Sequence, residues 1–324
     1  MNTLDQLQEK ISKALKGLSL YGEPQGLYEP ISYTLSQDGK RIRPLFVLVA
    51  NQMFGGNPEE AIPAATAIEI FHNFTLLHDD IIDQAPLRRG HETVYKKWNT
   101  NVAILSGDTM FAIAYGELAK SKPNILQDLM KVFTKTAIEV CEGQQYDIDF
   151  ERENEVDLQS YINMIRLKTA VLLAASLKIG ALIAESSQED ADKIYQFGIN
   201  MGIAFQLQDD LLDSYGDKMI FGKQTGGDIA ANKKTVLFIK AFEKANSSMK
   251  ARLKMLYADN SMHAEEKVAG VMDIFNSLAV REDTEELINI YFREACKNLD
   301  SISIPDERKQ VLRSIADSML KRVK

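Results

Sequence analysis

Residues 58–85 read PEEAIPAATAIEIFHNFTLLHDDIIDQA, and this stretch decides the fold class. Its apolar residues recur at the three- and four-residue spacing of one helix face, which predicts a single long helix. Pro63 is expected to kink its first turns or to mark a later start. The same spacing predicts further long helices at 102–120, 125–148, 158–184 and 190–214. Helices of about 20 residues span about 30 Å, so several of them packed together make one thick bundle.

The composition favours the same fold class. The chain has 324 residues, of which 45% are hydrophobic and 26% are charged, as in ordinary globular proteins. Only 18 glycines and 8 prolines are present, which leaves few residues for the many turns of a β-sandwich or barrel. The sequence contains no low-complexity linker and no solenoid repeat. We therefore expect one all-α domain that covers residues 1–324.

Charge and cysteine content exclude several classes of protein. The net charge of −8 disfavours a nucleic-acid binder, although a local basic cluster can still hold a small anion. Two cysteines, Cys141 and Cys296, are too few for a disulfide framework or a zinc site. No apolar run reaches the about 18 residues of a membrane span, and the start MNTLDQ lacks the form of a secretion signal. These features predict a soluble, cytoplasmic protein.

A DDxxD motif occurs twice, as DDIID at 79–83 and as DDLLD at 209–213, each near the end of an apolar helix. Helical spacing crowds the three carboxylates of each motif, and the negative end of the helix dipole adds to their repulsion. Such clusters need cations. Hard oxygen ligands suit Mg²⁺, which keeps bound water and bridges to substrate phosphates. Solvated acidic helix ends would explain one copy, but they explain two copies poorly.

Basic residues near these motifs indicate an anionic ligand. They are KRIR at 40–43, RR at 88–89, Lys168 within an apolar helix, Lys223 in the glycine-rich loop 216–228, and Lys233 beyond it. Each alone is consistent with ordinary surface charge. Together with two aspartate motifs they predict diphosphate groups held by Mg²⁺ on one side and by Lys or Arg on the other. Neither a P-loop nor a GxGxxG motif is present, so the diphosphate need not belong to a nucleotide.

The order of these motifs resembles that of trans-prenyltransferases of the polyprenyl diphosphate synthase family. The shared series is GKRIRP at 39–44, DDIID, LRRG at 87–90, EGQQYD at 142–147, KT at 168–169, QLQDDLLD from Gln206, GK at 222–223 and NKKTV at 232–236. The resemblance covers residues 38–235 and implies an isoprenoid synthase type of helical bundle with a central cavity. Asp38 stands where the family often has glycine. The KK pair leaves open whether Lys233 or Lys234 contacts diphosphate.

The resemblance implies two substrate sites and several Mg²⁺ ions. Isopentenyl diphosphate would bind Lys40, Arg43, His72 and Arg89. The allylic diphosphate would bind Arg88, Lys168, Lys223 and Lys233. Metal ligands would be Asp79, Asp83 and Asp209, with Asp80, Asp210 and Asp213 as more distant or water-mediated ligands. Thr169 and Gln206 would lie along the first isoprene units, and Gln144 and Asp147 would support that pocket. The catalytic set implied is Asp79, Asp83, Asp209, Lys168, Thr169 and Gln206.

For His72 a second interpretation is a hydrogen-bonded core histidine. It lies seven residues before Asp79 on the same helical face, which supports the diphosphate contact.

Residues just before the first aspartate motif bear on product length. Phe74 is the fifth and Thr75 the fourth residue before Asp79. Helix geometry places Thr75 nearer the aspartate face, whereas the resemblance assigns the chain-length position to Phe74. An aromatic residue there followed by a small one favours a C20 product, geranylgeranyl diphosphate, with C15 farnesyl diphosphate or a somewhat longer chain as alternatives. Phe74 as a core residue only is a further alternative.

The resemblance also implies a homodimer, with the helix around 102–118 at its interface, and dimethylallyl, geranyl or farnesyl diphosphate as the allylic partner. Two other functions compete. A class I terpene cyclase uses a DDxxD helix, but it has no need of the basic site at 39–43 for a second diphosphate. A non-catalytic partner subunit would usually lose aspartates or basic residues, and here both motifs are intact.

Overall fold

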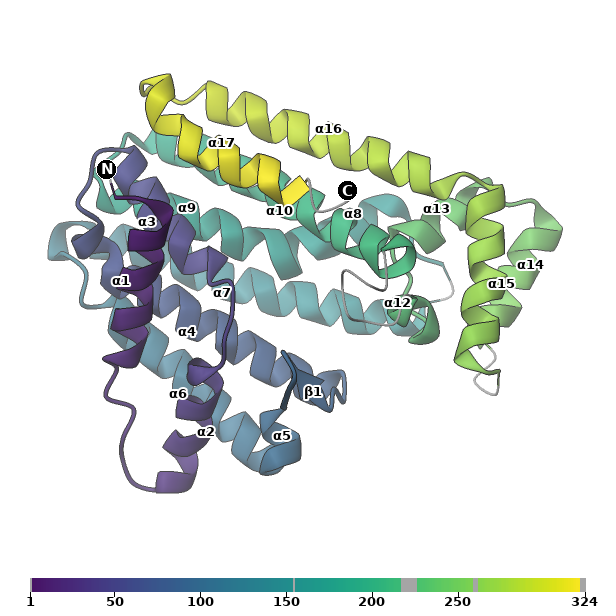
Figure 1. Ribbon diagram of the computed structural model, residues 1–324, viewed down its shortest axis with the longest axis horizontal. Coiled ribbons are helices and arrows are strands. Elements are labelled where there is room, and N and C mark those ends of the chain that lie inside the picture. Colours follow the sequence, from purple (N-terminus) through teal and green to yellow (C-terminus); the bar gives the residue numbers. More distant parts are fainter. Residues whose placement is uncertain (1, 154, 217–225, 259–261, 321–324) are drawn as a thin grey trace. The chain divides into compact units, whose positions relative to one another are not determined.

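Figure 1 shows a computed structural model of the chain, which describes residues 2–153, 155–216, 226–258 and 262–320. It is 80% helical, so the prediction of an all-α protein is confirmed. Strand structure in the described residues is limited to β1 (Leu87–Arg88) and β2 (His91–Glu92), which pair antiparallel. The chain forms two compact units. Unit 1 contains residues 1–134 and 175–192, and unit 2 contains residues 135–174 and 193–324. The expectation of a single domain stays a prediction.

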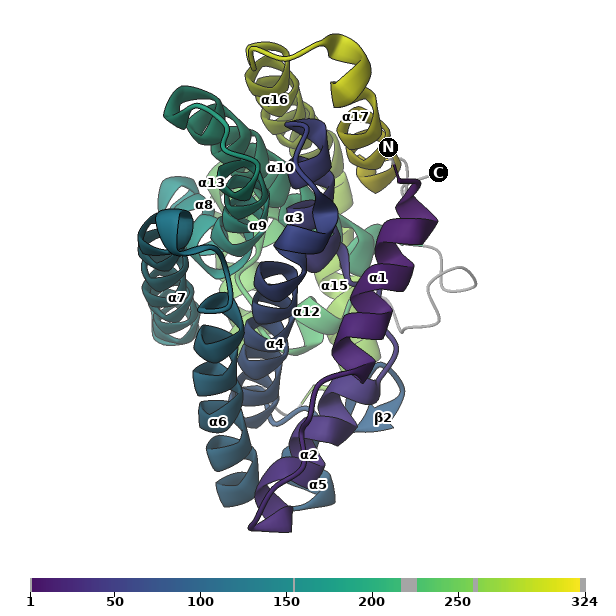
Figure 2. The same cartoon turned by 90° about the vertical axis from the view of Figure 1, so that its left-hand side faces the viewer.

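Unit 1 is built around the long helix that the sequence predicted. Its helices are α1 (Leu4–Lys16), α2 (Gln25–Ser36), α3 (Ile42–Met53), α4 (Pro58–Ile82), α5 (Val94–Lys97) and α6 (Thr100–Leu118), with the first part of α7 (Pro123–Arg152) and most of α9 (Val171–Ile183). α4 packs along α6 and α3, and Figure 2 shows α4 and α6 side by side. Because Ile68 and Phe71 are fully buried on α4, this helix forms the centre of the unit's core.

The start of α4 differs from one of the two expectations. Asn57 caps the helix by accepting a hydrogen bond from the backbone N–H of Glu59, and Pro58 occupies the first turn, where proline is tolerated. Pro63 therefore lies inside the helix rather than at a later start.

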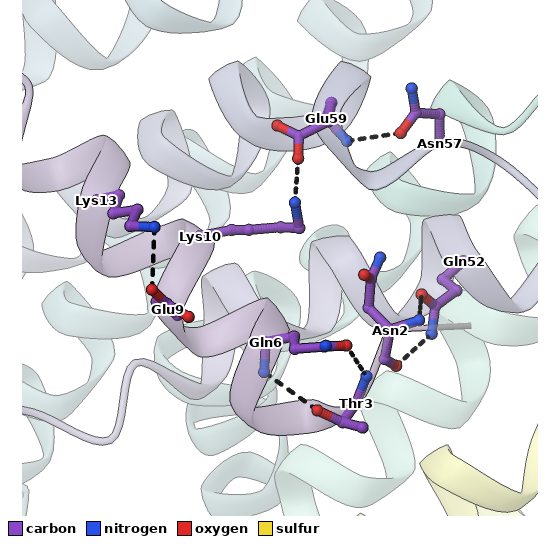
Figure 3. Close-up of polar contacts among 9 residues, drawn as sticks. All are labelled: Asn2, Thr3, Gln6, Glu9, Lys10, Lys13, Gln52, Asn57 and Glu59. Carbon is purple, nitrogen blue, oxygen red and sulfur yellow. Dashed lines mark hydrogen bonds and ion pairs between the residues drawn. The ribbon is translucent and has the colours of Figure 1, made fainter.

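Side-chain hydrogen bonds fix the amino-terminal helix within unit 1 (Figure 3). Thr3 and Gln6 form a capping box at the start of α1, in which each side chain accepts from the other's backbone N–H. Gln52 on α3 binds both backbone groups of Asn2, at 2.6 and 3.0 Å. The first turn of α1 is thereby held against α3.

Unit 2 is also helical. It contains the rest of α7, α8 (Leu158–Ile165), the π-helical turn η1 (Arg166–Ala170), most of α10 (Gln188–Tyr215), α12 (Gly227–Ala230), α13 (Val236–Lys244), α14 (Ser247–Ala258), α15 (Ala264–Ser277), α16 (Val280–Asp300) and α17 (Asp306–Leu320). In Figure 1, α17 lies along α16, with which it packs. The helix predicted over 158–184 thus contains a π turn, which the sequence did not indicate.

The remaining predicted helices agree with the structure to within a few residues at each end. Most of the glycine-rich loop, residues 217–225, lies outside the described residues, and Lys223 lies there too. No helix among the residues described is long and apolar enough to cross a membrane.

Candidate active site

The first aspartate motif ends α4, and its three carboxylates have different surroundings. Asp79 is half-buried and Asp83 is exposed. Asp80 is buried, and its Oδ1 accepts a hydrogen bond of 2.6 Å from Nε of Arg88. Burial raises the pKa of Asp80, while Arg88 acts in the opposite direction. Asp80 therefore fixes Arg88 against α4, and its role as a more distant metal ligand stays a prediction.

The LRRG motif forms a tight turn immediately after α4. Leu87 and Arg88 pair with the strand that follows, and Gly90 takes a φ of +81°, a conformation that suits glycine. Gly39, from the GKRIRP motif, lies against the guanidinium of Arg89, because a Cβ there would be 2.8 Å from Nη1. Two motifs that are about 50 residues apart in sequence therefore meet in unit 1.

Three of the four residues predicted for isopentenyl diphosphate lie together. Nη1 of Arg43, at the start of α3, lies 3.2 Å from Nε2 of His72 on α4. Burial lowers the pKa of His72 well below its usual value, and Arg43, Arg89 and Arg88 lower it further. The ring is therefore neutral beside several guanidinium groups, an arrangement suited to an anion. Lys40, the fourth residue, is exposed just before α3.

Glu69 belongs to the same region, and the sequence reasoning missed it. Its carboxylate is buried on α4, one turn before His72, and accepts a hydrogen bond of 3.1 Å from Nδ2 of Asn73. Burial raises the pKa of Glu69, whereas Asn73, Arg43, Arg89 and Arg41 oppose that shift. A glutamate on the apolar face of a helix, one turn before a histidine, is the signal that would have found it.

The second aspartate motif repeats this division of roles in unit 2. Asp209 is exposed, whereas Asp210 is buried. Both oxygens of Asp210 accept hydrogen bonds, Oδ2 from the hydroxyl of Tyr161 and Oδ1 from Nε2 of Gln206 at 3.1 Å. Burial raises the pKa of Asp210 to about 7. Oδ2 of Asp213 accepts a hydrogen bond of 2.9 Å from the backbone N–H of Asp228.

A pocket in unit 2 gathers residues from four of the predicted motifs. Among its lining residues are Lys168, Thr169, Gln206, Asp210 and Lys233. Nζ of Lys168 forms an ion pair with Oδ2 of Asp147 at 2.6 Å. The Thr169 hydroxyl donates a hydrogen bond of 3.0 Å to Oε1 of Gln206. Asp147 lines the pocket as well, whereas Gln144 is half-buried on α7 and is not among its lining residues.

Lys168 and Thr169 lie on the π turn, and a glycine on α7 makes room for it. A Cβ on Gly143 would be 2.3 Å from the backbone nitrogen of Lys168. Only a residue without a side chain allows this approach. Because π turns widen a helix locally and often occur at functional sites, the turn accounts for the position of Lys168 and Thr169 on the pocket wall.

Lys233 and Lys234 both line this pocket. Nζ of Lys234 donates a hydrogen bond of 2.8 Å to the backbone carbonyl of Phe150 at the end of α7. Burial lowers the pKa of Lys234. Lys234 thus anchors the α12–α13 segment, and the choice between Lys233 and Lys234 for the contact with diphosphate stays open.

The chain-length positions lie in an aromatic cluster of unit 1. The ring of Phe74 packs against Phe71 and Phe111, with centroids 5.6 and 5.2 Å apart. Thr75 is half-buried, and its hydroxyl donates a hydrogen bond of 2.8 Å to the backbone carbonyl of His72. Phe74 therefore joins α4 to α6, which fits both a chain-length residue and a core residue.

The accessible aspartates fit a hard cation. Among the residues that the structure describes, no group of three His, Cys, Asp or Glu side chains is arranged to hold a metal on its own. Asp79, Asp83 and Asp209 offer only oxygen, at the carbonyl ends of α4 and α10. Such ligands suit Mg²⁺, whose coordination is normally completed by water and by phosphate oxygens of a substrate.

Comparison with known proteins identifies the family. Residues 24–275 match the family model described as polyprenyl synthetase. The chain is 35% identical to a geranylgeranyl diphosphate synthase of Methanosarcina mazei, over 99% of this chain and 98% of that protein. It is 34% identical to a geranylfarnesyl diphosphate synthase of Aeropyrum pernix, over 90% and 93%. The crystal structure of a geranylgeranyl pyrophosphate synthase is similar with a TM-score of 0.95, at 43% identity and with full coverage of both chains.

The order of the motifs, the all-α fold and the match over most of the chain agree. This chain belongs to the polyprenyl synthetase family and is a trans-prenyltransferase.

Proposed function

We propose that this enzyme condenses isopentenyl diphosphate head to tail with an allylic diphosphate and forms mainly geranylgeranyl diphosphate. The observation that carries this proposal is the presence of two separate cationic sets. Arg43 and Arg89 surround a neutral His72 in unit 1, and Lys168 and Lys233 line a pocket in unit 2. Two sets suit two diphosphate substrates, whereas a terpene cyclase binds only one.

The set in unit 1 is suited to isopentenyl diphosphate. Guanidinium groups bind phosphate oxygens through paired, charge-assisted hydrogen bonds. Neutral His72 accepts from Arg43 and therefore restricts the orientation of that guanidinium. Isopentenyl diphosphate bound here keeps its diphosphate through the reaction. This site therefore orients the substrate and does not act on a breaking bond.

The pocket in unit 2 is suited to the allylic substrate. Its C–O bond breaks with both electrons leaving on the diphosphate, and positive charge spreads over the allylic carbons. Lys168 and Lys233 would stabilise the developing negative charge, and the oxygens of Thr169 and Gln206, which line the same pocket, would face the allylic carbons. The double bond of isopentenyl diphosphate then forms the new C–C bond, and a proton is lost to the released diphosphate.

Mg²⁺ would be held by Asp79 and Asp83 in one motif and by Asp209 in the other. When bound, it supplies further positive charge to the leaving diphosphate. The buried partners Asp80 and Asp210 instead hold protein groups, Arg88 in the first motif and Gln206 in the second.

The aromatic cluster of unit 1 supports a C20 limit. A growing chain that runs along α4 from Asp79 would meet Phe74, which Phe111 supports from α6. The small Thr75 leaves more room than a second aromatic residue would leave, which favours C20 over C15. A longer product is the second candidate, because two relatives are named as geranylfarnesyl diphosphate synthases.

A second copy of the chain is the expected partner. Ile104 and Leu105 on α6 are 40% and 58% exposed, and both lie within the predicted dimer helix at 102–118. Pairing of this face with a second copy would bury both side chains.

An activity assay tests the proposed reaction. Purified enzyme with Mg²⁺, isopentenyl diphosphate and farnesyl diphosphate should release diphosphate only when both substrates are present. EDTA should abolish that release, and excess Mg²⁺ should restore it. Diphosphate release from the allylic substrate alone at the same rate, with cyclic hydrocarbon products, would favour a terpene cyclase instead.

A further inference from the structure

Tyr161 on α8 lies outside the sequence motifs of the two substrate sites, yet its buried hydroxyl binds the second aspartate motif. It donates a hydrogen bond to Oδ2 of Asp210. Oδ1 of Asp210 accepts from Nε2 of Gln206, and Oε1 of Gln206 accepts from the hydroxyl of Thr169. Four residues from α8, η1 and α10 thus form one continuous series of hydrogen bonds, and all four line the same pocket.

This series has a direction, which is set at Asp210. Nε2 of Gln206 donates to Oδ1 of Asp210, so the side of the Gln206 amide that faces Asp210 is its NH₂ group. The amide oxygen therefore faces Thr169, whose hydroxyl donates to it. Tyr161 occupies the other oxygen of Asp210, so the carboxylate is held on both sides and cannot turn away from Gln206.

We propose that Tyr161 is a positioning residue for prenyl transfer: through Asp210 it fixes the sense of the Gln206 amide, so that oxygen rather than NH₂ is presented beside Thr169. This inference rests on the proposed function. Positive charge develops on the allylic carbons as the C–O bond breaks, and the negative end of a fixed amide dipole stabilises it without reorganisation. A reversed amide would present its NH₂ group and oppose that charge.

The same geometry controls a side reaction. If the allylic cation is poorly held, water adds to it and loses a proton, which gives an allylic alcohol and free diphosphate without a new C–C bond. Correct condensation instead joins the cation to the double bond of isopentenyl diphosphate, with loss of a proton from the adjacent carbon. The ratio of alcohol to condensed product therefore reports how well the cation is positioned.

Tyr161→Phe tests the inference, because it removes only the hydroxyl. The matched control is Tyr95→Phe, since the Tyr95 hydroxyl is buried in unit 1 and has no hydrogen-bond partner among the residues that the structure describes. We expect Y161F to lower kcat about tenfold to a hundredfold and to raise the ratio of alcohol to condensed product several-fold, with the KM for isopentenyl diphosphate unchanged. Y95F should match the wild type in all three quantities.

Two results would overturn the inference. One is a Y161F enzyme with wild-type kcat and ratio. The other is a Y161F enzyme that loses activity only in proportion to its folded fraction, with the ratio unchanged, because that is the behaviour of a purely structural residue.

A double-mutant comparison keeps the inference testable if Y161F folds poorly. Because Tyr161 acts through Gln206, adding Y161F to Gln206→Ala should lower kcat little further than Q206A alone does, when the variants are compared at equal folded concentration. Additive losses would contradict this route. A wild-type enzyme that forms no condensed product would contradict the proposed function itself, whereas a wild type that condenses, together with an unaffected Y161F, would contradict only the role of Tyr161.

Discussion

Arg43 donates a hydrogen bond to Nε2 of His72 across 3.2 Å, from the first turn of α3 to the middle of α4. Arginine has no acceptor, so Nε2 must be the unprotonated nitrogen of the ring. The low pKa of His72 agrees with this, since burial and the nearby guanidinium groups both disfavour the charged imidazole. A neutral histidine is therefore part of a strongly cationic site.

This arrangement predicts a pH dependence of stability. In the unfolded chain His72 takes up a proton near its ordinary pKa of 6.5, whereas in the folded protein it stays neutral well below that value. At His72 the unfolded state then binds more protons, so the contribution of His72 to the unfolding free energy should fall by about 1 kcal/mol between pH 7.5 and 5.5, while the raised pKa of Asp210 acts in the opposite direction. Urea unfolding at both pH values measures this change.

His72→Gln should remove that part of the pH dependence, since glutamine does not titrate. His263→Gln, which replaces an exposed histidine, is the control and should retain the wild-type dependence. Equal pH dependence in H72Q and the wild type would show that His72 does not cause it.

The two substrate sites predict different kinetic effects. Lys40→Ala or Arg43→Ala should raise the KM for isopentenyl diphosphate about tenfold to a hundredfold, because each removes a charge-assisted hydrogen bond to diphosphate. Asp79→Asn or Asp209→Asn should instead lower kcat about a hundredfold or more, since those carboxylates act as charge develops on the leaving group. Lys13→Ala, on the exposed face of α1, should change neither constant. If both kinds of variant changed kcat and the KM for isopentenyl diphosphate by the same factors, the assignment of the two sites would be refuted.

The sequence predicted α4 and α10 well because a buried helix face is a local pattern of apolar residues. It also located both aspartate motifs, since their spacing is fixed by the helix itself. It did not reveal that Asp80 and Asp210 turn inward. That outcome depends on Arg88, which the turn after α4 brings back, and on Tyr161, which lies 49 residues away on another helix. Tertiary partners of this kind leave no periodic signal.

The π turn was missed for a similar reason. Residues 158–184 have uninterrupted helical spacing, and only the close approach of α7 at Gly143 marks the place where the helix widens.

Gly143→Ala should destabilise the protein. The added methyl group would meet the backbone of the π turn at Lys168, and backbone atoms cannot move aside as a flexible side chain can. We expect a loss of about 1–3 kcal/mol in unfolding free energy, measured by urea unfolding. Gly26→Ala on α2 is the matched control, because its Cβ would meet nothing within 4 Å. A G143A variant as stable as the wild type would argue against the close contact.

Phe74→Ala should lengthen the product. Removal of the ring opens the cluster with Phe71 and Phe111 below Asp79, and the chain can then grow by at least one further C5 unit. Thr75→Ala removes only a hydroxyl that binds the His72 carbonyl, so it should retain the wild-type product. Chromatography of the dephosphorylated products measures both. An active F74A enzyme with an unchanged product would place the chain-length limit at another residue.

The most direct test of the central claim is product analysis from the wild-type enzyme with labelled isopentenyl diphosphate, Mg²⁺ and, in separate reactions, dimethylallyl, geranyl or farnesyl diphosphate. The two cationic sets and the Phe74–Phe111 contact predict that all three reactions yield mainly all-trans C20 geranylgeranyl diphosphate. Mainly C15 or C25 product would contradict the assigned limit at Phe74. No incorporation of label with any of the three partners would contradict prenyl transfer between two diphosphates as the activity of this protein.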